Sequence, residues 1–314
     1  MQRLKSIIMY GLGAATVIVI IFLTAYTEPQ SSVATTHNAL LVSDEGDTLL
    51  PAQNVHAPQL PEAVDFAGEA LPMNNFDAKE RLDRELVSNC FRHSSTFLIF
   101  KKANRYFPVI EPILEQEGLP NDFKYLVVVE SALSNAVSAA GAKGFWQFME
   151  TSAKAQGLEI SKEVDERYDL EKATRAACRY LKEAKEKLGS WTLAAAAYNM
   201  GEPGLRAAIK EQGVNSYFDL DLTAETSRYI PKIMAIKIVM QQPKQYGFNF
   251  SKNDLYPPMT NVKIVEEKGG ISDLAAFAQQ HKTTYRMLKE YNPWLRQRAL
   301  TNKSKKTYQI KIPV

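Results

Sequence analysis

Cysteine and histidine are scarce in this chain, which limits the sites that it can build. Two cysteines cannot form a disulfide framework, and no Cys or His spacing matches a zinc site, so we expect neither a metal nor a cofactor. Cys90 and Cys178 lie in helix-like, partly apolar segments, which favours buried free thiols. A single bridge between them would also be compatible with an oxidising compartment. The four histidines are scattered, at His37, His56, His93 and His281.

An excess of charge is also lacking. The 38 basic and 35 acidic residues give a net charge of +3, and no dense Lys/Arg stripe is present, so nucleic acid is not an expected partner. The 314 residues leave room for one sizeable domain and a small additional module.

Charge is absent altogether from the segment 7–26, which follows Arg3 and Lys5. Its 20 residues are enough to cross a bilayer as a helix. No Lys or Arg occurs in residues 27–75, whereas seven acids do, which places the N-terminus in the cytoplasm and the rest outside. Residues 1–26 are therefore predicted to be a transmembrane anchor or a removed signal segment.

The remaining chain divides by composition. Residues 27–75 hold five prolines and one aromatic residue, which predicts a flexible acidic linker. Residues 76–245 carry helical patterns, with Asp169 and Ser190 as helix caps and a long final helix from about 223 to Pro243. After a second linker at 246–260, residues 261–314 read as strand–helix–helix–strand. The expected fold is mainly α, an all-α domain followed by a small β-α-α-β module.

Glu130 is the main candidate for chemistry. It follows the apolar run Tyr125–Val129, and loss of solvation at that position would raise the pKa of its carboxyl group. A carboxyl group that is neutral at neutral pH can protonate a glycosidic oxygen. The common alternative is a charged residue at a helix end that reaches solvent.

A motif from Ser138 to Met149 follows Glu130 closely. Its glycines would let the backbone approach a sugar chain, and Trp146 offers a flat face for sugar rings. Gln147 offers both a donor and an acceptor. Two later clusters, Ala194–Gly201 and Glu225–Pro231, each contain a tyrosine, and this combination favours a functional site over an incidental charge.

At these residues the chain resembles the lytic transglycosylases of the SLT, goose-lysozyme-like type, closest to the membrane-bound lytic murein transglycosylase D group. The resemblance covers about residues 105–242 and implies a lysozyme-like catalytic domain with Glu130 as the catalytic acid/base. In the family, a tyrosine of the Ala-Tyr-Asn-x-Gly motif lies beside the acid, here Tyr198. The resemblance also implies a set of substrate-binding residues, namely Ser131, Ser138, Gly144, Gln147, Met149, Tyr198, Asn199 and Tyr229.

The C-terminal module resembles a LysM domain. The matching features are its strands, Tyr291-Asn292-Pro293 and the final Tyr308–Pro313, while Gly269-Gly270-Ile271 replaces the usual Gly-Asp-(Thr/Ser). LysM domains bind glycans that contain N-acetylglucosamine. A packing module that has lost this affinity is the alternative.

Together the resemblances imply an enzyme that cleaves the MurNAc–GlcNAc bond of peptidoglycan and forms 1,6-anhydro-MurNAc. The expected location is the cell envelope, with the N-terminal segment in the membrane, the catalytic domain facing the periplasm, and peptidoglycan glycan strands as partner. No protein partner can be named from the sequence. The alternatives are a goose-type muramidase, which hydrolyses the same bond, and a non-catalytic peptidoglycan-binding protein.

Overall fold

The computed structural model describes residues 55–303 and 305–314, of which residues 57–314 form one unit. The predicted anchor or signal segment, residues 1–26, lies outside the described residues. Within the described ranges, no helix is both long enough and apolar enough to cross a membrane.

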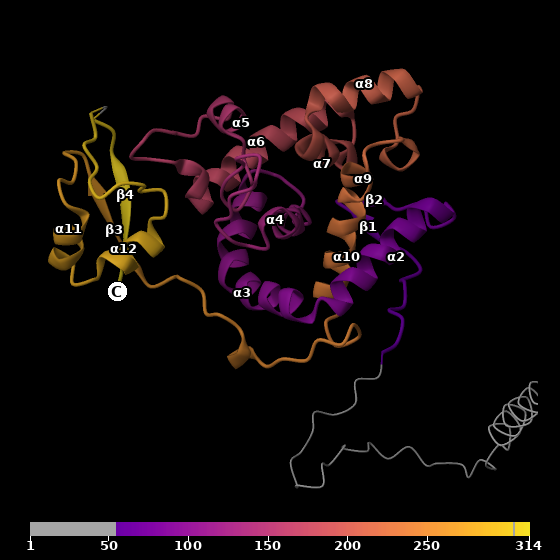
Figure 1. The fold of residues 1–314 in the computed structure, drawn as a ribbon, viewed down its shortest axis with the longest axis horizontal. Helices are drawn as coiled ribbons and strands as arrows, with labels where there is room; N and C mark the ends of the chain where they lie inside the picture. The colour runs from indigo at the N-terminus through magenta and orange to yellow at the C-terminus, as the bar shows by residue number, and fades with distance from the viewer. Residues whose placement is uncertain (1–54, 304) are drawn as a thin grey trace, which may run out of the picture. The chain divides into compact units, whose positions relative to one another are not determined.

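Helices dominate residues 76–241, which confirms the predicted fold class (Figure 1). The caps predicted from the sequence are present: the Asp169 side chain accepts from the Lys172 amide at 3.0 Å, and that of Ser190 accepts from the Leu193 amide at 3.1 Å. The helices are α2 (Phe76–Phe91), α3 (His93–Gln116), α4 (Phe123–Ser131), α5 (Glu150–Ala155), α6 (Leu170–Leu188), α7 (Trp191–Met200), α8 (Glu202–Gln212), α9 (Ala224–Ser227) and α10 (Tyr229–Gln241).

The helix α10 lies at the centre of this helical domain and packs against α2, α4 and α7. Nearly all of its side chains are buried, which is expected of a helix that is apolar on every face. Its buried Lys237 donates to the Asp122 carboxylate at 2.7 Å and to the Asp65 carbonyl oxygen at 3.0 Å. These bonds satisfy a buried ammonium group and join α10 to the start of α4.

The single long helix predicted from residue 223 is wrong, because the structure has two helices there. The chain leaves α9 at Arg228 and begins α10 at Tyr229. Arg228 reaches the buried carboxyl group of Glu85 on α2 at 2.5 Å, a contact between residues far apart in sequence that no local pattern reveals.

The prediction of a flexible linker up to residue 75 is also wrong for its last part. Strands β1 (Asp65–Phe66) and β2 (Glu69–Ala70) form a small hairpin, and Phe66 is fully buried against Phe123. The Glu69 carboxylate accepts from the amide and the hydroxyl of Thr192 at the start of α7. Polar contacts with distant helices hold this segment, and its weak apolar pattern does not reveal them.

The second predicted linker, residues 246–260, runs along α3. Phe248 and Phe250 pack on Phe100 with ring centroids 5.4 and 4.8 Å apart, and the Tyr256 amide donates to the Lys101 carbonyl oxygen at 3.2 Å. The segment is therefore fixed to the helical domain.

The C-terminal module (residues 261–314) has the predicted order: β3 (Val262–Glu267), α11 (Leu274–Gln280), α12 (Tyr285–Tyr291) and β4 (Tyr308–Pro313). The two strands pair antiparallel, from Val262 opposite Pro313 to Glu267 opposite Tyr308. Asn292 is fully buried and exchanges hydrogen bonds with the Lys311 backbone at 2.7 and 2.8 Å. This contact explains the Tyr-Asn-Pro sequence, because it ties the end of α12 to β4.

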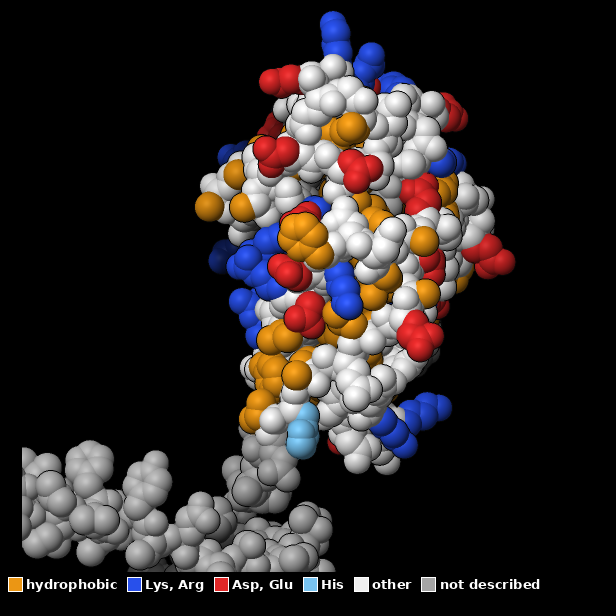
Figure 2. Space-filling view, turned by 90° about the vertical axis from the view of Figure 1, so that its right-hand side faces the viewer, with side chains coloured by type: hydrophobic (Ala, Val, Ile, Leu, Met, Phe, Trp, Pro, Cys, Tyr) orange, Lys and Arg blue, Asp and Glu red, His pale blue; other side chains and the backbone are white. Residues whose placement is uncertain are grey.

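The module packs on the segment that precedes α6. The Asp165 amide donates to the Trp294 carbonyl oxygen at 2.9 Å, and Val164 and Tyr168 belong to the same apolar cluster as the module's own core. The Arg296 guanidinium lies 4.1 Å from the Tyr168 ring centroid. On the face drawn in Figure 2, acidic side chains are scattered, whereas several Lys and Arg side chains gather along the left edge.

Candidate active site

Glu130 occupies the last turn of α4, a helix whose other side chains are mostly buried. The helix stops because Ala132 and Leu133 both adopt left-handed backbone conformations, with φ of 48° and 53°. The carboxyl group thus lies at the negative end of the helix dipole, which disfavours its ionised form.

The phenol of Tyr229, the first residue of α10, donates to the Glu130 carboxyl group. Burial raises the pKa of Glu130 from 4.5 to about 7. The bond from Tyr229 lowers this pKa, the negative charge of Glu225 raises it, and the positive charge of Lys232 lowers it. Because burial dominates, the carboxyl group keeps its proton to a much higher pH than an exposed glutamate.

Tyr198 lies within electrostatic range of the acid but makes no hydrogen bond with it. Burial and then the charge of Glu130 raise the pKa of Tyr198 well above its ordinary range, so its hydroxyl stays protonated. That hydroxyl donates to the backbone carbonyl oxygen of Trp146 at 2.6 Å. The tyrosine that touches Glu130 in this structure is therefore Tyr229, and Tyr198 supports the Gly144–Met149 loop.

The prediction of Trp146 as a flat face for sugar rings is wrong. Its side chain has no exposed surface, and the indole nitrogen donates to the Thr174 hydroxyl on α6 at 2.9 Å. A buried indole needs a hydrogen-bond partner for its N–H, and no local sequence pattern identifies Thr174 as that partner.

Gln147 is the polar residue of the loop that stays partly open. Its backbone φ is 49°, and its amide nitrogen donates to the carbonyl oxygens of Ala136 and Gly144 at 3.1 and 2.7 Å. Both donor hydrogens are used within the loop, so Gln147 has its side-chain oxygen to offer a ligand as an acceptor. The Ser138 hydroxyl accepts from the Ala142 amide at 3.0 Å and closes the preceding turn.

Gly144 packs against backbone. A Cβ atom at this position would lie 1.9 Å from the carbonyl oxygen of Arg167, and its φ of 83° is in the left-handed region. The Arg167 side chain forms a buried bidentate pair with Asp165, at 2.9 and 2.7 Å. The segment 165–167 thus contacts both this loop and, through the Asp165 amide, the C-terminal module.

The other predicted site residues have different surroundings. Ser131 is buried and accepts from the Ser134 amide at 3.3 Å, whereas Met149 is 45% exposed. Asn199 donates to the Glu225 carboxylate at 3.2 Å and accepts from the Thr226 hydroxyl at 2.8 Å. It therefore joins the end of α7 to α9, beside the acid.

Sequence reasoning missed Glu225, whose charge reaches Glu130, and the Asp165–Arg167 pair. Glu225 begins the Glu-Thr-x-x-Tyr motif, so its position could have been found from the sequence, whereas the pair could not. In the part of the chain that the structure describes, no group of three or more Cys, His, Asp or Glu side chains could hold a metal ion. Cys90 and Cys178 are both buried and unpaired.

The fold and these motifs together define the class of protein to which the chain is similar. Residues 108–219 match the transglycosylase SLT domain, and residues 263–314 match the C-terminal LysM-like domain of soluble lytic transglycosylases. The chain therefore consists, over these ranges, of an SLT transglycosylase domain followed by a LysM-like domain.

Individual relatives agree with this class. Two proteins, from Escherichia coli strain K12 and from Escherichia coli O6:H1, are each named membrane-bound lytic murein transglycosylase D. Each is 26% identical to this chain over 253 residues, which is 77% of this chain and 53% of the relative. The chain thus spans about half the length of these relatives.

Proposed function

We propose that this chain is a peptidoglycan lytic transglycosylase that cleaves the MurNAc–GlcNAc bond and leaves 1,6-anhydro-MurNAc. The observation that carries the proposal is the Glu130 carboxyl group, which burial keeps protonated near neutral pH and which Tyr229 holds in place.

In the proposed reaction, Glu130 gives its proton to the glycosidic oxygen as the bond from that oxygen to the muramoyl anomeric carbon breaks. The 6-hydroxyl oxygen of the same sugar then attacks that carbon and closes the anhydro ring. The hydroxyl proton passes to the Glu130 carboxylate, which restores the acid without consuming water. The substrate's N-acetyl group can assist the departure of the leaving group.

We propose substrate-binding roles for the residues around the acid. The exposed Met149 side chain and the free acceptor of Gln147 can contact the glycan directly. Ser131, Ser138, Gly144, Tyr198 and Asn199 would instead act by holding the loops in place, since they contact other parts of the protein.

The test is digestion of purified sacculi with product analysis by mass spectrometry. Wild-type protein is expected to release 1,6-anhydro products and the Glu130→Gln variant none. Equal turnover by both proteins would remove Glu130 from its role, and no turnover by either would favour the peptidoglycan-binding alternative.

A second candidate, a muramidase, is favoured by the position of Glu225. A two-carboxylate glycosidase needs a second carboxylate at the sugar, and the charge of Glu225 already reaches Glu130. We expect the Glu225→Gln variant to keep forming anhydro products. Reducing-end muramic acid as the wild-type product, lost in Glu225→Gln, would establish the hydrolase.

We also propose that residues 1–26 hold the chain in the membrane, with the catalytic domain (76–245, extended by the packed residues 59–75) and the module (261–314) in the periplasm. Fractionation of cells that express the full chain should place it with membranes, whereas a chain that begins at residue 57 should not. If the full chain is expressed but the recovered protein lacks residues 1–26, these residues are instead a cleaved signal segment.

A further inference from the structure

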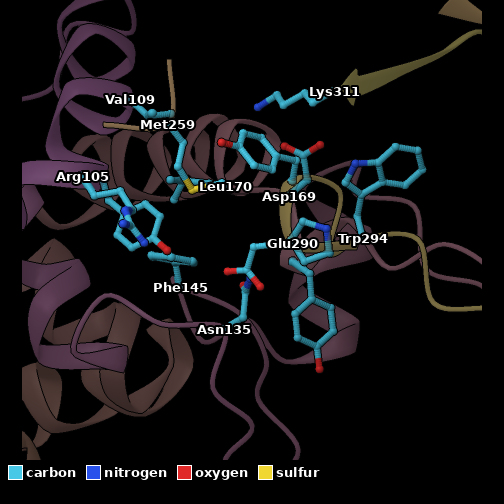
Figure 3. Close-up of a pocket in the computed structure, with 14 residues that line it drawn as sticks. Arg105, Val109, Asn135, Phe145, Asp169, Leu170, Met259, Glu290, Trp294 and Lys311 are labelled. Atoms are coloured by element: carbon cyan, nitrogen blue, oxygen red, sulfur yellow. The ribbon is translucent and has the colours of Figure 1, made fainter. Parts of the chain in front are cut away.

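A pocket of about 100 Å³ lies where the C-terminal module meets the helical domain. Helix α3 contributes Arg105, the start of α6 contributes Asp169, and the module contributes Glu290, Trp294 and Lys311. Figure 3 shows that the Asp169 and Glu290 carboxyl groups both point into this space, with Arg105 and Lys311 on different sides of it. The helical domain and the C-terminal module therefore build this pocket together.

The charged groups of this pocket are incompletely matched within the protein. Among the described residues, the exposed Glu290 has no hydrogen bond or ion pair, and Arg105 donates to the Pro257 carbonyl oxygen at 3.1 Å but has no carboxylate partner. Lys311, by contrast, pairs with the Glu171 carboxylate at 2.9 Å. The Asp169 side chain accepts a hydrogen bond from the Lys172 amide, and burial raises the pKa of Asp169. A ligand that carries both charges would supply partners for Arg105 and Glu290.

The wall of the pocket also has an apolar part. Phe145 and Trp294 are each 4% exposed and form lining surface together with Tyr291. A suitable ligand therefore has carbon surface between its charged ends. Uncharged sugar rings would match the aromatic wall but would offer no partner of opposite charge to Arg105 or Glu290.

The pocket is close to the candidate active site along the chain. Asn135 and Phe145, which line it, belong to the loops that follow Glu130. Five residues separate Glu130 from Asn135, so their Cα atoms are at most about 18 Å apart. A group attached to the sugar at the active site can span such a distance.

We propose that this pocket binds the peptide stem of peptidoglycan, whose amino acids carry both ammonium and carboxylate groups. Arg105 would contact a carboxylate of the stem, and Glu290 its ammonium group. This inference rests on the proposed function, because the stem is attached to the MurNAc residue at which cleavage is proposed. It makes the module a part of substrate selection through an interface with the helical domain.

The test is calorimetric titration of the full chain carrying Glu130→Gln, which blocks turnover, with two probes. One probe is a disaccharide–tetrapeptide muropeptide, and the other is the same disaccharide without its peptide. We expect the stem to strengthen binding about tenfold or more, equivalent to about 1.4 kcal/mol, because hydrogen bonds to charged groups are the strong ones. Adding Glu290→Gln or Arg105→Gln should remove most of that gain.

Glu266→Gln is the matched control, because it removes the same charge from an exposed residue of the module that is not in the pocket. It should leave both affinities unchanged. Equal affinity for the two probes, or an undiminished gain in both pocket variants, would overturn the proposal. Cleavage of stem-free glycan strands by the Glu130-containing protein, measured separately, tests the proposed function independently of this pocket.

Discussion

Glu130 and Asp169 are two partly buried carboxyl groups that stand at opposite ends of helices. Burial raises the pKa of both. Glu130 lies in the last turn of α4, near the negative end of the dipole, and accepts from a phenol. Asp169 precedes α6, at the positive end, and accepts from a backbone amide.

The difference shows that burial alone does not make a catalytic acid. At Asp169 the helix N-terminus and the positive charges of Lys311 and Lys172 favour the ionised form and oppose desolvation, which suits a helix cap. At Glu130 the negative end of the helix dipole disfavours the ionised form, in the same direction as desolvation. The negative charge of Glu225 also raises the pKa of Glu130. The helix end and the neighbouring charges thus separate the proposed proton donor, Glu130, from the structural carboxylate, Asp169.

The largest expected effect is on catalysis. Glu130→Gln should lower the rate of glycan cleavage by about 10²–10⁴-fold, the usual contribution of a general acid. Initial rates on purified sacculi measure this loss. Glu115→Gln, which removes an exposed carboxyl group from α3, should leave the rate unchanged, and a similar loss in both variants would point to a general charge effect.

The next effect concerns the pH dependence of the rate. Tyr229→Phe removes a hydrogen bond that lowers the pKa of Glu130, so this pKa should rise above about 7. Because the acid must be protonated, the wild-type rate should fall as pH rises through about 7, and the fall should move to higher pH in the variant. A pH–rate profile measures the shift.

Tyr246→Phe provides the control for this profile, since its hydroxyl donates to the Gln59 carbonyl oxygen, and Tyr246 does not affect the pKa of Glu130. The position of the fall should be the same as in the wild type. A Tyr229→Phe profile that moves to lower pH would contradict the assigned role of the phenol.

The smallest effect is on stability, and its sign should differ between the two acids. The pKa of Glu130 is raised on folding, so its favourable contribution is full below about 4.5 and is lost as pH rises through about 7. The substitution Glu130→Gln should therefore be more favourable for stability above pH 7 than below pH 4.5. The difference between its effects on the free energy of unfolding at these two pH values should be at most about 3 kcal/mol. Asp169→Ala removes a helix cap and should lower the free energy of unfolding by about 1 kcal/mol.

Urea unfolding of the three proteins on both sides of neutral pH measures these changes. A destabilised Glu130→Gln protein in alkaline solution would mean that the carboxylate is well accommodated, and the comparison between the two acids would fail.

The sequence allowed accurate prediction wherever local chemistry decides the structure. Asp169 and Ser190 were predicted as caps because their side chains can accept amides of the next turn, and both do so. The order of strands and helices in the C-terminal module was likewise predictable, because its alternating and helical patterns are short and clearly bounded.

Contacts between distant residues could not be read from the sequence. Trp146 and Thr174 are 28 residues apart, so the burial of the indole depends on how α6 lies against the loop. The hairpin at 65–70 is held by the Asp122 carboxylate before α4, by the amide and hydroxyl of Thr192 on α7 and by Lys237 on α10. Its composition resembles that of a linker. The choice between Tyr198 and Tyr229 as the partner of the acid also depended on tertiary geometry.

The most direct test of the account is the pKa of the Glu130 carboxyl group itself. A ¹³C NMR titration of the carboxyl carbons, assigned by comparison with Glu130→Gln, measures it in the folded protein. The structure predicts a midpoint of about 7. A midpoint near 4.5, the value of an exposed glutamate, would contradict the claim that Glu130 carries the catalytic proton at neutral pH.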